Sequence, residues 1–158
     1  MKNKLFLMWL AFFASALTAV SYSQNKQQNI DPQELYAYFS QQMKMTEQEL
    51  DALDVFLTSE EEDYITAYGQ AYALKIFSQY GKEWKLDVKD IERESAIALA
   101  EADLIKVKLD GQKAEVAEAY NRLCIFWAAK EVLRIYIDSP KNAEAFVLGD
   151  PPTLIDYD

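Results

Sequence analysis

Tyrosine recurs at every fourth position in Tyr64, Tyr68 and Tyr72, directly after an acidic run. At this spacing the three rings share one face of an α-helix, and the acidic run stands at the helix N-terminus. Tyrosine is amphipathic and is enriched at protein interfaces. The pattern therefore predicts a surface for a protein partner, made of Glu60, Glu61, Glu62, Asp63, Tyr64, Tyr68 and Tyr72. The alternative is structural, with the rings filling the core and the acids complementing the helix dipole.

Neighbouring carboxylates could in principle catalyse hydrolysis. This reaction needs two carboxyl groups held in a cleft with different pKa values. The chain has 26 acidic residues, so close pairs arise by number alone, and nothing singles one of them out. A carboxylate-based hydrolase therefore stays an alternative that the sequence does not favour. The pairs considered are Glu92/Glu94, Glu101/Asp103 and Glu115/Glu118.

Several other site chemistries are excluded by composition. The chain has no histidine, which rules out His-based catalysis and His-ligated metal sites. Its one cysteine, Cys124, cannot form an internal disulfide and lies in an apolar run, so we expect it to be a buried side chain. Neither a calcium-binding loop motif nor a glycine-rich phosphate loop is present. We expect no catalytic residues, no cofactor and no metal ion.

The formal net charge is −10. A surface this acidic repels the phosphates of nucleic acids and of anionic membranes, so neither is an expected partner. A basic protein would be attracted and steered to it.

The N-terminus has the layout of an export signal. Lys2 and Lys4 precede an uncharged apolar stretch from Leu5 to Val20, and small residues follow. The stretch is shorter than the roughly 20 residues that span a bilayer. We expect residues 1–23 to be a cleaved signal peptide and residues 24–30 a flexible leader, so that the mature protein is periplasmic or secreted. Because the signal peptide carries two lysines and no acid, its removal takes the charge from −10 to −12.

The segments that carry these residues are predicted to be α-helices. Cap residues followed three positions later by Glu begin at Asp31, Thr46 and Ser59, and Asp87 is a further candidate cap. Gly81, Gly111 and Pro140 are the matching stop signals. These signals predict helices over 32–45, 47–57, 60–80, 88–109 and 112–138. Within 88–109 an apolar seam from Val88 to Leu109 predicts contact with another helix, and Ile97, Leu104 and Val107 widen that face.

The last helix is apolar on nearly every side, so we expect it to lie at the centre. Phe126, Trp127, Leu133 and Ile137 are the predicted core residues. Two positively charged residues, Lys130 and Arg134, interrupt this apolar helix. Glu131 and Asp138 can pair with Arg134, whereas Lys130 needs a partner from another helix, and we expect Glu94 or Glu101. An anion-binding pocket at Lys130 and Arg134 is the alternative.

The sequence thus predicts an all-α, single-domain bundle of four to five helices over 31–140 around a central C-terminal helix. Residues 141–158 are predicted to form an irregular acidic tail that lies over the bundle or hangs free. The predicted function is an exported, non-enzymatic binding protein of the inhibitor or immunity type. The alternatives are a homodimerising or chaperone-like helical module, which would use the Val88–Leu109 seam, and the hydrolase.

Overall fold

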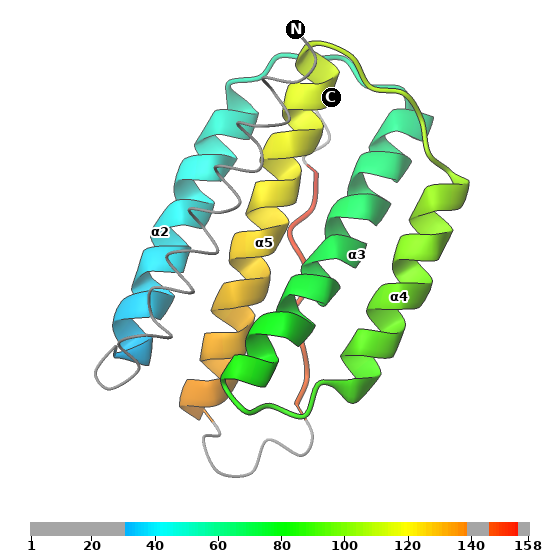
Figure 1. Cartoon of the computed structure of the whole chain (residues 1–158). Helices are drawn as coiled ribbons and strands as arrows, with labels where there is room; N and C mark the ends of the chain where they lie inside the picture. Colours follow the sequence, from blue (N-terminus) through cyan, green and yellow to red (C-terminus); the bar gives the residue numbers. More distant parts are fainter. Residues whose placement is uncertain (1–30, 139–145, 155–158) are drawn as a thin grey trace, which may run out of the picture.

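The computed structural model describes residues 31–138 and 146–154. The described residues form four α-helices and no β-strand (Figure 1). The helices are α2 (Pro32–Asp51), α3 (Ser59–Glu83), α4 (Lys89–Leu104) and α5 (Gln112–Asp138). The predicted all-α fold is confirmed. The predicted signal peptide and flexible leader lie outside the described residues.

The helices stand side by side in the spatial order α2, α5, α3, α4 (Figure 1). Among the described helices, α5 packs against α2 and α3, and α4 packs against α3 alone. The last helix in the sequence is therefore inserted between the first two, which agrees with its predicted central place.

Helix α5 supplies much of the buried core. Trp127 and Leu133 are buried as predicted, while Phe126 and Ile137 are only half-buried. Tyr120, which was not among the predicted core residues, is fully buried, as is Phe77 of α3. Full burial of one large apolar side chain stabilises a fold by roughly 1.5–3 kcal/mol, so these contacts carry much of the stability.

Two of the predicted helix starts are close to correct. The Asp31 side chain accepts a hydrogen bond of 2.9 Å from the Gln33 amide, and Pro32 occupies the first turn. At α3 the cap is Thr58 rather than Ser59. The Thr58 hydroxyl accepts from the Glu61 amide at 3.3 Å, and the Glu61 carboxylate accepts from the Thr58 amide at 2.8 Å.

The predicted break at Thr46 is wrong. Helix α2 runs through this position to Asp51, so the helices predicted over 32–45 and 47–57 are replaced by one helix and a non-helical connection. Thr46 is buried, and its hydroxyl donates to the Gln42 carbonyl at 2.9 Å instead of capping a new helix. A threonine hydroxyl can satisfy itself on the preceding turn, and the packing of Phe39 and Leu50 keeps the helix intact.

The predicted ends of two helices also need correction. Helix α3 continues past Gly81 to Glu83, and the positive φ of 62° occurs at Lys85. A Cβ atom on Gly81 would lie 2.7 Å from Val88 Cγ1, so this glycine permits close packing rather than a stop. Helix α4 ends at Leu104 rather than Leu109. It begins at Lys89, and its N-cap residue is Val88 rather than Asp87, although the Asp87 carboxylate accepts a long hydrogen bond of 3.4 Å from the Lys89 amide. Gly111, with φ of 58°, precedes α5 and does not end α4.

Residues 146–154 form an extended segment, which we call the C-terminal strap. It is non-helical and runs along the helices, drawn in red in Figure 1. Phe146 packs against Phe77 with ring centroids 5.4 Å apart, and Leu148 and Leu154 also contact the core. The strap lies over the helices, which is one of the two outcomes predicted for the tail. The remaining residues of the predicted tail, 141–145 and 155–158, lie outside the described residues.

Candidate functional site

The three tyrosines of α3 form a continuous row of rings. The ring centroids of Tyr64 and Tyr68 are 6.0 Å apart, and those of Tyr68 and Tyr72 are 6.1 Å apart with nearly parallel planes. Lys75 extends the row, because its ammonium lies 5.6 Å from the centroid of the Tyr72 ring. Contact between successive rings along one helix face follows from the four-residue spacing.

Each of these tyrosines is half-buried. Partial burial raises the pKa of all three hydroxyls, and the charge of Asp103 on α4 adds to this at Tyr64 and Tyr68. The phenols are therefore neutral hydrogen-bonding groups at ordinary pH. The rings are neither core residues nor freely exposed. Their burial is therefore intermediate between the predicted partner surface and the structural alternative of core packing.

The acidic run before the tyrosines divides into two parts. Glu61 caps α3 and accepts two hydrogen bonds, of 2.7 and 2.8 Å, from the Lys113 ammonium on α5. The Lys113 ammonium and the Thr58 amide lower the pKa of Glu61. Glu60 and Asp63 are exposed and make no ion pair with the described residues, and Glu62 is half-buried. Glu61 therefore holds α3 to α5, and Glu60 and Asp63 remain available to a partner.

A polar cluster between α5 and the strap was not predicted. Arg134 pairs with Glu131 at 2.8 Å and lies 3.7 Å from Asp138, and both partners were expected. In addition, Arg134 donates to the Val147 carbonyl at 2.9 Å, and the Gly149 amide donates to Glu131 at 2.9 Å. Only 6% of Glu131 is exposed, while Arg134 is half-buried, so an ion pair with a buried carboxylate fastens the strap.

The partner predicted for Lys130 is wrong. Glu94 and Glu101 are on α4, which contacts only α3 among the described helices. The Lys130 ammonium instead lies 5.2 Å from the centroid of the Tyr36 ring on α2. The face of an aromatic ring attracts a cation, so the Tyr36 ring of α2 takes the place of the carboxylate expected from α4. No sequence pattern marks Tyr36 as this neighbour, because the packing of α2 on α5 is seen only in the folded chain.

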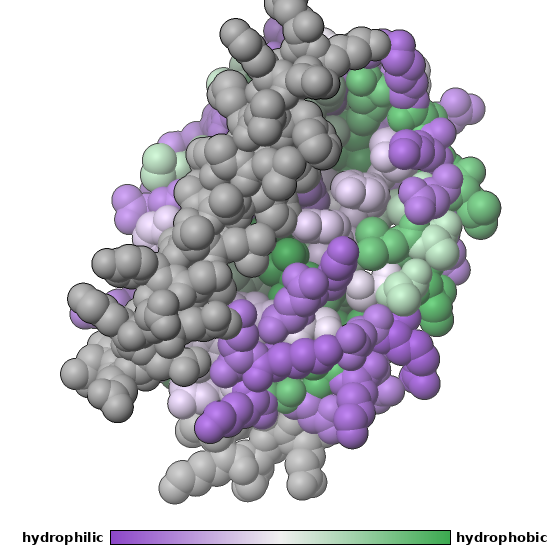
Figure 2. All heavy atoms as spheres, viewed as in Figure 1, coloured by the Kyte–Doolittle hydropathy of each residue, from purple (hydrophilic) through white to green (hydrophobic). Residues whose placement is uncertain are grey.

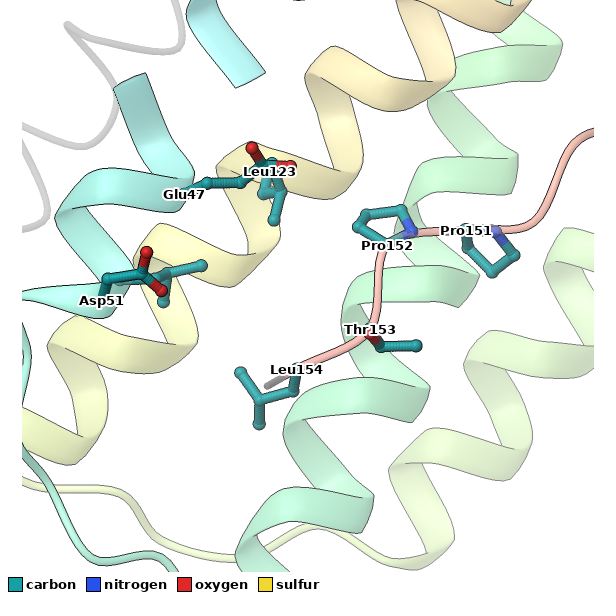
Figure 3. Close-up of a pocket in the computed structure, with 8 residues that line it drawn as sticks. Glu47, Asp51, Leu123, Pro151, Pro152, Thr153 and Leu154 are labelled. Carbon is teal, nitrogen blue, oxygen red and sulfur yellow. The ribbon is translucent and has the colours of Figure 1, made fainter. Parts of the chain in front are cut away.

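A groove of about 420 Å³ opens where α2, α5 and the end of the strap meet (Figure 3). Its floor is apolar, since Leu50 and Leu123 are 6% and 2% exposed, and Leu154 stands at one end. Glu47 and Asp51, one helical turn apart on α2, form one rim, and Pro151, Pro152 and Thr153 form another. The sequence did not reveal this groove, because its walls come from three segments far apart in the chain.

The outer side of α4 carries exposed apolar residues. Ile97 and Leu104 are 54% and 86% exposed, and Ile105, just after the helix, is 46% exposed. Figure 2 shows apolar residues gathered on the side of the molecule where Figure 1 places α4. The expectation that Ile97 and Leu104 widen the packed face of this helix is therefore wrong. Val88, Ser95 and Ala102 of the predicted seam are buried, in agreement with the packing of α4 on α3.

Cys124 is buried as predicted, next to Tyr120 and opposite Gly69. Burial raises the pKa of its thiol to about 12, which leaves almost no reactive thiolate at ordinary pH.

Comparison with known protein families, with curated proteins and with solved structures found no match for this chain. Within residues 31–138 and 146–154, no group of three or more His, Cys, Asp or Glu side chains could hold a metal ion. No helix in the described part of the chain is long and apolar enough to cross a membrane.

Proposed function

We propose that this chain is an exported, non-enzymatic binding protein that docks a basic protein partner, as an inhibitor or immunity-type protein does. The docking surface is what we call the α3 face, made of Glu60, Asp63, Tyr64, Tyr68 and Tyr72. The acidic net charge would attract such a partner and favour its approach over that of nucleic acid.

The observation that carries the proposal is the half-buried tyrosine row that continues into exposed acids. Glu60 lies one turn before Tyr64, so the charged and aromatic groups are neighbours along one helix. Rings that already pack against each other lose little conformational entropy when a partner covers them. The acids supply attraction at long range, and the rings supply apolar area and hydroxyl groups at contact.

The test begins with affinity capture of a partner from the exported fraction of the source, followed by measurement of its Kd for purified variants. Tyr64→Ala and the double variant Glu60→Gln/Asp63→Asn should each weaken binding about tenfold or more, as interface anchors do. The control Glu34→Gln/Glu94→Gln removes the same charge from α2 and α4 and should change Kd by less than about twofold. Failure to capture any partner, together with hydrolytic activity of the purified protein, would contradict the proposal.

A second candidate function, self-association, is supported by the exposed apolar residues of α4. Ile97, Leu104 and Ile105 would be covered if two copies met at this side. The repulsion between two acidic chains works against it. Light scattering decides: a monomer at micromolar concentration removes this candidate, and a dimer that Leu104→Lys dissociates supports it.

A further inference from the structure

We propose that the groove between α2, α5 and the C-terminal strap binds a short peptide segment in which lysine or arginine alternates with apolar residues. This inference rests on the proposed function, since it names the chemistry of the segment that the protein partner would present. It adds a second contact, separate in sequence from the α3 face.

The groove has the size and lining of a ligand site. Its volume of about 420 Å³ falls in the range of roughly 300–1,000 Å³ that is usual for such sites. The half-buried Leu154 and the rings of Pro151 and Pro152 offer most of the apolar surface to a ligand (Figure 3), because Leu50 and Leu123 beneath them are nearly fully buried. Apolar contact alone would accept many ligands, so the rim decides which kind fits.

The rim favours a cation. Glu47 and Asp51 are exposed, and neither forms an ion pair with any residue that the structure describes. Arg122, which precedes the groove residue Leu123 on α5, is held by Glu49 at 2.6 Å and by Glu118 at 3.4 Å. Two carboxylates one turn apart above an apolar floor match a basic side chain, whose methylene stem is apolar and whose end is charged.

The strap favours a peptide over a small amine. Pro151 and Pro152 keep this segment extended, and the Pro152 carbonyl already accepts from Tyr120. The backbone groups of Thr153 make no hydrogen bond within the described part of the chain. An extended peptide lying along Thr153 could pair with these groups while its alternate side chains enter the groove.

The experiment uses the exported form of the full chain and a synthetic peptide, acetyl-Leu-Lys-Leu-Arg-Leu-amide, followed by NMR of backbone amides. The peptide should shift the amide signals of Leu50, Leu123 and Thr153. The acidic counterpart acetyl-Leu-Glu-Leu-Glu-Leu-amide should leave them unchanged. n-Pentylammonium should bind at least about tenfold more weakly than the basic peptide, because it has neither backbone groups nor a second side chain.

Variants locate the site. Glu47→Gln/Asp51→Asn should weaken peptide binding about threefold to thirtyfold, as expected for the loss of two exposed ion pairs. The matched variant Glu60→Gln/Asp63→Asn removes the same charge from the α3 face and should change binding by less than about twofold. The folded state of both variants is checked from the same spectra.

Each contrary result overturns the inference. No shift at the groove with millimolar peptide, equal binding of the acidic peptide, or equal binding of n-pentylammonium would each exclude a basic peptide site. Loss of binding only in the α3-face variant would place the peptide at the α3 face, which refutes the groove and leaves the proposed function standing. The proposed function fails separately, by the capture experiment, even if the synthetic peptide binds here.

Discussion

The Tyr120 hydroxyl donates a hydrogen bond of 2.7 Å to the carbonyl oxygen of Pro152. Tyr120 is fully buried in α5, and Pro152 belongs to the strap, so this bond joins the centre of the fold to its last described segment. The same hydroxyl accepts from Gln70 Nε2 of α3 at 3.3 Å. One phenol thus connects α3, α5 and the strap.

Tyr120→Phe should therefore lower the free energy of unfolding by about 1–2 kcal/mol, because it leaves the Pro152 carbonyl and the Gln70 amide without their partner. Urea unfolding followed by circular dichroism measures the change. Tyr38→Phe, which alters an exposed tyrosine of α2, serves as the control and should shift stability by less than about 0.5 kcal/mol. Equal stability of Tyr120→Phe and the unaltered protein would show that this bond holds nothing in place.

Gly69→Ala should destabilise the protein although alanine is the better helix former. A Cβ atom here would lie 2.7 Å from Cε1 of the Tyr120 ring, and that ring is fully buried and cannot move aside. Overpacking costs typically 1–3 kcal/mol, against a gain of about 1 kcal/mol from helix propensity. We expect a net loss of about 1 kcal/mol and a lower midpoint of thermal unfolding. A rise in the midpoint would mean that α3 and α5 can separate at this crossing.

Acid should loosen the strap through Glu131. Burial acts to raise the pKa of this carboxyl, but the hydrogen bonds from Arg134 and the Gly149 amide, with the charges of Arg134 and Lys130, hold it below its ordinary value of 4.5. A carboxyl with a lowered folded-state pKa stabilises the fold above its unfolded pKa. This contribution is full above about pH 5 and is lost as the pH falls below 4.5 and through the folded-state value.

Glu131→Gln removes that contribution at neutral pH and should flatten the fall of stability between about pH 5 and pH 3. Urea unfolding across this range checks it. Glu34→Gln, at an exposed carboxyl with no ion pair in the described residues, is the matched control and should keep the slope of the unaltered protein. If both variants show the same slope, then Glu131 does not couple the strap to pH.

Cys124 should not react with a thiol reagent such as 5,5′-dithiobis(2-nitrobenzoate) while the protein is folded. Its side chain has no exposed surface, and burial raises the thiol pKa to about 12. Labelling should become fast only in denaturant, with the same midpoint as unfolding. Rapid reaction of one thiol per chain in native buffer would place Cys124 at the surface and contradict the packing of α3 on α5.

The helices themselves could be predicted from local signals, since α5 is apolar on nearly all sides and Asp31 caps α2 as its type suggests. Thr46 shows where such signals fail. A threonine before Glu-Gln-Glu has the pattern of an N-cap, but the helix continues through it because Phe39 before it and Leu50 after it both pack in the core. Gly81 was read as a stop because sequence does not show that Val88 lies against it.

The site could be predicted only in part for the same reason. The tyrosine row follows from spacing within one helix, and it is present. The groove depends on bringing Glu47, Leu123 and Thr153 together, and no local pattern encodes contacts between segments so far apart. Likewise, the Glu131 carboxylate meets the Gly149 amide only after the chain has turned back on itself.

The insertion of α5 between α2 and α3 sets the order in which the chain can reach its final form. Helix α2 packs against α5 and against neither of the other described helices. It therefore cannot bury its apolar side on another helix until α5, Gln112–Asp138, has been synthesised. When the chain is made from its N-terminus, the apolar side of α2 stays exposed to water while α3 and α4 can already pack together. The position of α5 therefore makes the packing of α2 depend on the last helix of the chain.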